Sequence, residues 1–118
     1  MSAINVEFYE KEDGTVPVLE FLSSLNGKMG AKVTWTIARL EEYGHELREP
    51  YSKPLGDGIF ELRVQFGQDI SRVLYFFIVN GCAVLTHGFI KKTQKTPRLE
   101  IERAKRYRED FLRRRKRK

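Results

Sequence analysis

The chain has 118 residues, of which 41% are hydrophobic and 32% are charged, and its formal net charge is +6. This composition excludes a disordered chain, and the length excludes two ordinary domains, so we expect residues 1–118 to form one domain. No apolar run approaches the ~20 residues of a transmembrane helix, and the first residues lack the pattern of a secretory signal. One cysteine excludes a disulfide framework and a cysteine-rich zinc site. We therefore expect a small, soluble protein of the cytoplasm.

The positive charge is concentrated toward the C-terminus. Residues 97–118 carry 11 Lys or Arg and 4 Asp or Glu, whereas residues 1–49 carry 5 basic and 9 acidic residues. Clustered Lys and Arg are the electrostatic signature of a protein that binds a polyanion. The last six residues, 113–118, are all basic, and we expect them to form a frayed tail.

Hydrophobic periodicity predicts the elements in chain order. Residues 5–9 read as a strand, and two helices follow. Residues 50–55 read as an extended segment or a loop, and three strands and a last helix follow. The predicted helices cover 17–25, 29–43 and 97–114, and the later strands cover 59–66, 70–79 and 82–90. The order β-α-α-β-β-β-α predicts the α+β class, with an antiparallel sheet, two N-terminal helices on one face and a C-terminal helix.

Two short turns predict the register of the three central strands. Asn80-Gly81 is typical of a two-residue hairpin turn, and Gln68-Asp69 is interpreted as a second one. The predicted cross-strand pairs are Arg72–Phe89, Leu74–His87, Phe76–Leu85 and Arg72–Gln65. Because directly paired residues share a face, this register separates an apolar face from a mixed one.

The apolar face is expected to receive the two N-terminal helices. Its predicted members are Phe60, Leu62, Val64, Val73, Tyr75, Phe77, Val84 and Ile90. The mixed face is predicted to hold Glu61, Arg63, Gln65, Arg72, His87 and Lys91 beside Leu74, Phe76 and Leu85. Glu61 is its only acid and is interpreted as an ion-pair partner of Arg63 or Arg72. Converging basic side chains suit phosphate oxygens, although a solvated face partly covered by the C-terminal helix remains the alternative.

Three segments carry a resemblance to a known family. They are residues 53–63 (KPLGDGIFELR), 71–76 (SRVLYF) and 87–97 (HGFIKKTQKTP). Together they resemble the RelE/ParE superfamily of bacterial toxins, in particular its phage-derived HigB-like branch. The resemblance implies a RelE-like fold and a type II toxin–antitoxin toxin. The implied partners are a cognate antitoxin of the helix-turn-helix kind, the ribosome and messenger RNA, with operator DNA contacted only through the antitoxin.

The resemblance also implies a reaction. RelE- and HigB-like members cut messenger RNA on the ribosome, and ParE-like members poison DNA gyrase instead, which remains the alternative here. We expect an endoribonuclease without metal or cofactor, in which a 2′-OH attacks the adjacent phosphate. No Asp/Glu/His cluster suggests a metal site.

Candidate residues follow partly from the resemblance and partly from the chemistry that is needed. Arg72 matches a phosphate-binding arginine of the family, Arg63 matches a second basic position, and Lys92 beside Lys91 falls near a basic residue that follows the last strand. His87 has the natural pKa for acid–base work, but packing beneath the C-terminal helix is its alternative role. The residues expected to bind RNA outside the catalytic set are Lys53, Lys95, Arg113, Arg114 and Arg115.

Overall fold

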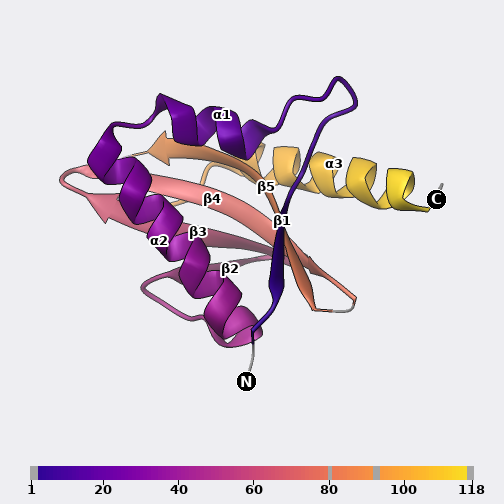
Figure 1. Ribbon diagram of the computed structural model, residues 1–118, viewed down its shortest axis with the longest axis horizontal. Helices are drawn as coiled ribbons and strands as arrows, with labels where there is room; N and C mark the ends of the chain where they lie inside the picture. The colour runs from indigo at the N-terminus through magenta and orange to yellow at the C-terminus, as the bar shows by residue number, and fades with distance from the viewer. Residues whose placement is uncertain (1–2, 80, 92–93, 117–118) are drawn as a thin grey trace.

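The computed structural model describes residues 3–79, 81–91 and 94–116, which form one sheet with helices on both sides (Figure 1). The elements in chain order are β1 (Asn5–Phe8), α1 (Pro17–Ser24), α2 (Gly27–Tyr43), the short 3-10 helix η1 (Gly44–Glu46), β2 (Ser52–Gly56), β3 (Ile59–Phe66), β4 (Asp69–Ile78), β5 (Cys82–Lys91) and α3 (Arg98–Arg115). The predicted α+β class and the three predicted helices are confirmed.

The sheet has the strand order β1-β5-β4-β3-β2. It differs from the prediction in two respects, because β1 pairs with β5 in parallel and the segment before the first predicted hairpin forms the extra strand β2. Pro54 lies within β2 and obscured it in the sequence. Its missing N–H is tolerated because β2 is an edge strand.

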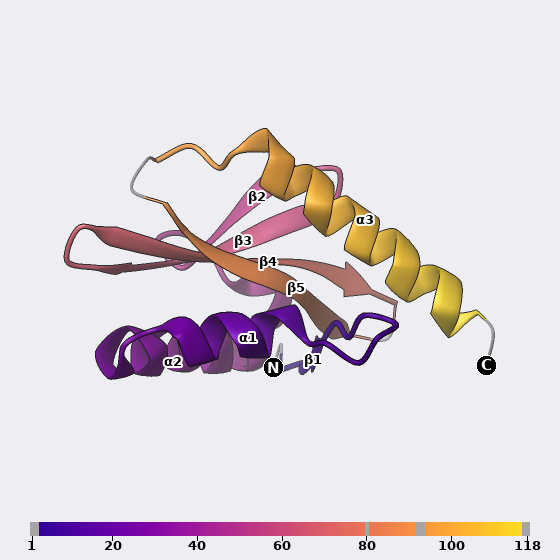
Figure 2. The same ribbon diagram turned by 90° about the horizontal axis from the view of Figure 1, so that it is seen from above.

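The sheet separates α1 and α2 on one face from α3 on the other (Figure 2), and a hydrophobic cluster lies on each face. On one face α1 and α2 pack on the strands, as predicted, and bury Leu62, Val64, Val73 and Tyr75. On the other face α3 covers Leu74, Phe76 and Val84, with Ala104 fully buried at the contact. Of the described residues, none lies in a helix with both the length and the apolar character needed to cross a bilayer.

The β3–β4 register differs from the predicted one by two residues. Arg72 pairs with Arg63 rather than with Gln65, and the two-residue loop is Gly67-Gln68. Gly67 has a φ of 65°, a conformation that glycine adopts without steric cost, and this places the turn one residue earlier. A shift of two residues leaves every side chain on its predicted face. It also places Arg63 directly opposite Arg72.

The β4–β5 register is confirmed at one end and wrong at the other. Arg72 pairs with Phe89 and Leu74 with His87, but Phe76 pairs with Val84 instead of Leu85. The register shifts between Leu74 and Tyr75, which leaves Thr86 as an extra residue in β5.

This bulge exchanges the faces of two predicted core residues. Val84 packs in the cluster under α3, and Leu85 packs in the cluster under α1 and α2, the reverse of the prediction. Ile78 pairs with Cys82, so the connection spans three positions, 79–81, rather than a two-residue turn. Asn80, on which the prediction relied, lies outside the described residues.

Candidate active site

Arg63 and Arg72 converge on one buried carboxylate. The two arginines are directly opposite each other on β3 and β4, and Nε of each lies 3.5 Å from an oxygen of Glu61. The side chains of Glu61 and Arg72 are fully buried, whereas that of Arg63 is 18% exposed. The interpretation of Glu61 as an ion-pair partner is confirmed, and its carboxylate serves both arginines.

The segment between β5 and α3 closes over this cluster. Thr96 Oγ1 donates a 2.6 Å hydrogen bond to Oε1 of Glu61. Arg63 Nη2 donates one of 2.6 Å to the Gln94 carbonyl oxygen. Gln94 and Thr96 lie in the segment 87–97 that carries the family resemblance, but neither was predicted as a site residue, because neither contact follows from strand alternation.

Arg63 faces an open groove at the end of the sheet. The other residues that line this groove are Glu49, Pro50, Gln65, Ile70 and Gln94. A second groove shares Gln94 with it and is lined by Lys53, Pro54, Leu55, Lys95, Thr96 and Ile101. Lys53 pairs with Glu61 between β2 and β3, so Lys53 and Glu61 share a face of the sheet. The structure therefore gathers Lys53, Arg63 and Lys95 along one polar surface.

Arg72 is placed beneath this surface rather than on it. Burial lowers the pKa of its guanidinium, and the adjacent Glu61 carboxylate opposes that shift. A buried guanidinium contributes positive potential and holds the carboxylate in place. Arg63 is the member of the pair that a ligand in the groove reaches.

His87 lies under α3, in a different cavity from Arg63. One ring nitrogen lies 3.0 Å from Glu100 of α3, and the other lies 3.1 Å from the hydroxyl of Thr86, the bulge residue. The cavity that His87 lines also includes Lys11, Pro17, Glu20, Phe21, Gly88, Arg103 and Tyr107. Burial lowers the pKa of His87, so the neutral ring is favoured. This geometry makes His87 a brace between β5 and α3.

The predicted lysines fall in different places. Lys91 is exposed at the end of β5 opposite Ile70, on the same face as Arg72. Lys95 is exposed beside Lys53, while Lys92 lies outside the described residues. Lys91 and Lys95 thus border the surface that includes Arg63.

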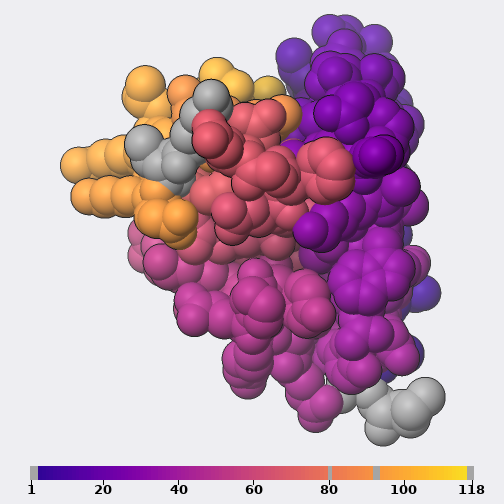
Figure 3. Space-filling model, turned by 90° about the vertical axis from the view of Figure 1, so that its left-hand side faces the viewer, coloured from indigo at the N-terminus to yellow at the C-terminus, as the bar shows by residue number. Residues whose placement is uncertain are grey.

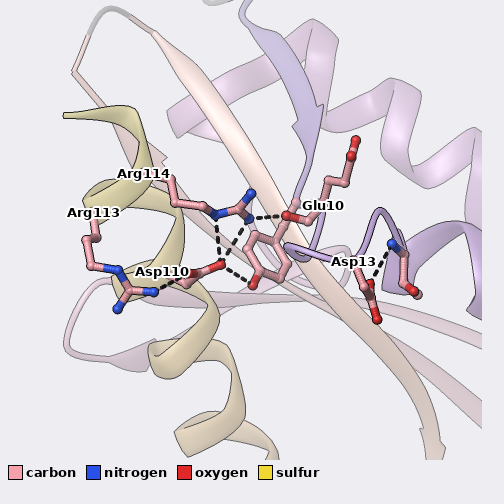
Figure 4. A network of polar contacts seen from close by, with 7 residues as sticks. Glu10, Asp13, Asp110, Arg113 and Arg114 are labelled. Carbon is pink, nitrogen blue, oxygen red and sulfur yellow. Dashed lines mark hydrogen bonds and ion pairs between the residues drawn. The ribbon is translucent and has the colours of Figure 1, made fainter. Parts of the chain in front are cut away.

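Arg113, Arg114 and Arg115 lie at the opposite end of α3. The helix continues through Arg115, so the predicted fraying is wrong for these three residues. Asp110 pairs with Arg113 and with Arg114, and Arg114 also donates to the Glu10 carbonyl oxygen (Figure 4). A helix of 18 residues is about 27 Å long, which separates these arginines from the Glu61 cluster.

Among the residues in the described ranges, no group of three or more His, Cys, Asp or Glu could hold a metal ion. The groups that surround the Glu61 carboxylate are the guanidinium groups of Arg63 and Arg72, the hydroxyl of Thr96 and, on the adjoining surface, the ammonium groups of lysines. These are donors suited to an anionic ligand such as a phosphate.

The comparisons with known proteins identify the family. A search of curated proteins found no match. The profile of the phage-derived Gp49-like proteins (DUF891) matches residues 20–109, from α1 through most of α3. This family is associated with RelE-like toxins. Because the match covers more than half of the chain, the protein belongs to the Gp49-like family of phage-derived proteins.

Proposed function

We propose that the protein is the toxin of a type II toxin–antitoxin pair and stops translation by cutting messenger RNA on the ribosome. Membership of a family associated with RelE-like toxins supports this function. The observation that carries it is the placement of Arg63, which faces an open groove and is backed by a second arginine across the strand pair. The Nε of Arg63 is buried and faces Oε2 of Glu61 at 3.5 Å, which holds the guanidinium in place beside the groove.

The proposed reaction is an in-line attack by a ribose 2′-oxygen on the adjacent phosphorus. The proton of the 2′-hydroxyl passes to water as the new bond to phosphorus forms, and the bond from phosphorus to the 5′-oxygen breaks. The products are a 2′,3′-cyclic phosphate and, once the leaving oxygen is protonated, a 5′-hydroxyl. Negative charge grows on the non-bridging oxygens in the transition state, and a planar guanidinium can donate to two of them at once. Arg63 supplies these donors, while Arg72 adds positive potential from below.

Glu61 is a positioning residue in this proposal. Its carboxylate lies between Arg63 and Arg72 and accepts the hydroxyl of Thr96, so it fixes the arginine pair relative to the segment before α3. Its complete burial shields it from a substrate. A fixed donor geometry matters because donors that are already oriented need no rearrangement during the reaction.

The 5′-oxygen must receive a proton as it leaves. Lys91 is the better of the described candidates, because an exposed ammonium on the face of Arg72 is a donor within reach of the groove's ligand. His87 is buried beneath α3 and hydrogen-bonded to Glu100. We therefore assign His87 to packing and Lys91 to proton donation.

The proposed setting is the bacterial cytoplasm, where ribosomes and a cognate antitoxin are present. An antitoxin that presents acidic side chains would neutralise the surface formed by Lys53, Arg63 and Lys95. Operator DNA would be contacted only through that antitoxin.

Primer extension on messenger RNA in a translating extract tests the function. We expect cuts that require ribosomes and leave a 5′-hydroxyl with a 2′,3′-cyclic phosphate. Intact messenger RNA in arrested cells, with accumulated broken DNA, would contradict the nuclease and point to DNA gyrase as the target.

A further inference from the structure

A cluster of aromatic rings and one arginine covers the outer face of α2. Trp35, Arg39 and Tyr43 follow one another at helical spacing, and Tyr51 joins them from the loop before β2. The Arg39 guanidinium carbon lies 5.0 Å from the Trp35 ring centroid, 4.6 Å from that of Tyr43 and 5.9 Å from that of Tyr51. Trp35 is 49% exposed and Tyr43 is 37% exposed, so the cluster presents open ring surface to solvent.

This aromatic cluster borders the groove that Arg63 lines. The Tyr51 carbonyl oxygen accepts the backbone N–H of Arg63 at 2.9 Å, and the centroids of the Tyr51 and Trp35 rings are 5.8 Å apart. Lys32, one helical turn before Trp35, donates through Nζ to the carbonyl oxygen of Gln65 in the same groove. Figure 3 faces this side of the molecule, where the segment before β2, the β3–β4 hairpin and α2 form one continuous surface.

The side chains along this surface combine cations with aromatic rings. Arg63 and Lys32 lie at the groove, and Trp35, Arg39 and Tyr43 continue along α2. Cations that follow a phosphate backbone, beside rings on which bases stack, are the usual way in which proteins bind single-stranded nucleic acid. Arg39 also pairs with Glu42 at 3.3 Å, but that carboxylate is 60% exposed, and such surface pairs are weak.

We propose that the RNA strand leaving the Arg63 groove crosses the sheet edge at Tyr51 and stacks a base on Trp35, with Arg39 and Lys32 close to its phosphates. This inference rests on the proposed function, because it extends the substrate path of the same site. An RNA strand fits this surface better than a protein partner, because the exposed rings surround a guanidinium rather than an apolar patch. Trp35 is thus a substrate-binding residue remote from the reacting phosphate.

The fluorescence of Trp35 gives a direct test, because it is the only tryptophan in the chain. The full-length protein is titrated with a single-stranded RNA oligonucleotide whose 2′-O-methyl groups prevent cleavage. Stacking on the indole predicts quenching of Trp35 emission and an affinity that falls as salt is added. Binding to the same labelled oligonucleotide is measured independently by fluorescence anisotropy.

Three variants make the anisotropy test specific. Trp35→Ala is expected to weaken binding about tenfold, a loss of about 1.4 kcal/mol. Trp35→Phe keeps a ring and should recover most of that affinity. Leu19→Ala, which removes an apolar side chain of nearly equal exposure on α1, should leave binding unchanged. Circular dichroism confirms that each variant is folded.

The outcomes separate this inference from the proposed function. Quenching together with weakened binding by Trp35→Ala supports the RNA path, even if the wild-type protein fails to cut messenger RNA and the nuclease proposal fails. RNA affinity equal to wild type in Trp35→Ala overturns the path, even if ribosome-dependent cleavage is intact. Equal RNA affinity combined with loss of antitoxin binding would overturn it in favour of a protein partner on α2.

Discussion

Near each end of α3, one carboxylate lies between two arginines, but the surroundings of the two clusters differ. Near the N-terminal end Glu61 lies between Arg63 and Arg72, and near the C-terminal end Asp110 lies between Arg113 and Arg114. The side chains of Glu61 and Arg72 are fully buried, whereas that of Asp110 is 16% exposed and those of its two arginines are 52% and 29% exposed. The first cluster borders an open groove, and the second ties the helix to the loop that follows β1.

Burial decides what each arrangement does. Water screens the pairs at Asp110, so they contribute little individually, and the contact of Asp110 with Tyr9 fixes the helix instead. The charges at Glu61 are removed from water and interact strongly, so the cluster holds its geometry and projects positive potential into the groove. One cluster is suited to binding an anion, and the other is suited to anchoring α3.

The largest predicted difference is in the free energy of unfolding when the carboxylate charge of each cluster is removed in turn. Glu61→Gln leaves two neighbouring buried or half-buried arginines without their shared anion and should lower the free energy of unfolding by about 3–5 kcal/mol. The matched variant Asp110→Asn keeps an oxygen that can accept the Tyr9 hydroxyl and loses only its pairs with two partly exposed arginines, so it should cost about 1 kcal/mol. Urea denaturation measures both values. If sulfate restores much of the stability of Glu61→Gln and none of that of Asp110→Asn, the anion-binding character of the first cluster is supported, and equal losses would contradict the comparison.

Tyr9→Phe tests the anchor alone. The phenol donates a 2.6 Å hydrogen bond to Asp110, and a bond to a charged group contributes about 1.5–3 kcal/mol, so a loss in this range is expected in urea denaturation. Burial, followed by the bond to Asp110, raises the pKa of Tyr9 to about 12.

The raised pKa of Tyr9 also predicts how the stability of the wild-type protein changes at alkaline pH. Since the unfolded phenol ionises near 10 and the folded one near 12, the stabilisation is complete below pH 10 and is lost as the pH rises toward 12. Tyr9→Phe should remove part of this alkaline loss. Tyr75, whose pKa is also raised to about 12 by burial, should retain the rest. An alkaline profile identical to wild type would show that the Tyr9 contact is absent in solution.

The two clusters should also differ in the salt dependence of RNA binding. Lys53→Ala removes a cation beside the groove and should reduce the slope of log affinity against log salt by about 0.7, the value for one single-strand phosphate contact. Arg113→Ala removes a cation already paired with Asp110 and should change the slope less. Anisotropy titrations at several salt concentrations give both slopes, and the reverse ranking would place the RNA along the far end of α3.

The smallest predicted effect concerns His87, the brace between β5 and α3. Burial lowers its pKa, so the unfolded chain binds this proton more readily than the folded one. Stability should therefore decline as the pH falls below 6.5, the ordinary pKa, while the carboxylates of Asp57 and Asp110 respond only in more acidic solution because their pKa values are lowered from 3.8. In His87→Gln the stability between pH 7 and pH 5 should be flatter than in wild type, and an unchanged profile would assign the decline to other groups.

The sequence was sufficient to predict the helices and the central strands, because their periodicities are regular. It misplaced Val84 and Leu85, because the bulge at Thr86 leaves no trace in the alternation of a largely apolar strand. The hydrogen bond from Thr86 Oγ1 to the Leu74 carbonyl oxygen helps to satisfy the bulged backbone, and only the folded strands bring these groups together. The sequence left residues 50–55 open between an extended segment and a loop, because Pro54 is disfavoured in strands other than edge strands, and the structure shows the edge strand β2 there.

Strand alternation predicted that Arg63 and Arg72 share a face, because a register error of two residues preserves parity. It did not predict that Arg72 is buried and Arg63 is accessible. The segment between β5 and α3, which contacts Glu61 and Arg63 of β3 through Thr96 and Gln94, is not visible to strand alternation. The sequence predicted a helix to residue 114 with fraying from residue 113, whereas the helix continues through Arg115 and contacts with Asp110 and Glu10 hold Arg114 in place.

The comparison between the two clusters is tested most directly by primer extension on ribosomes with the variants Arg63→Ala and Arg114→Ala, each at equal concentration of folded protein. Loss of one preorganised donor to the transition state should lower cleavage by Arg63→Ala about 100-fold or more, while Arg114→Ala should cut at nearly the wild-type rate. Wild-type cleavage by Arg63→Ala, or an equal loss in the two variants, would contradict the assignment of the chemistry to the groove beside Glu61.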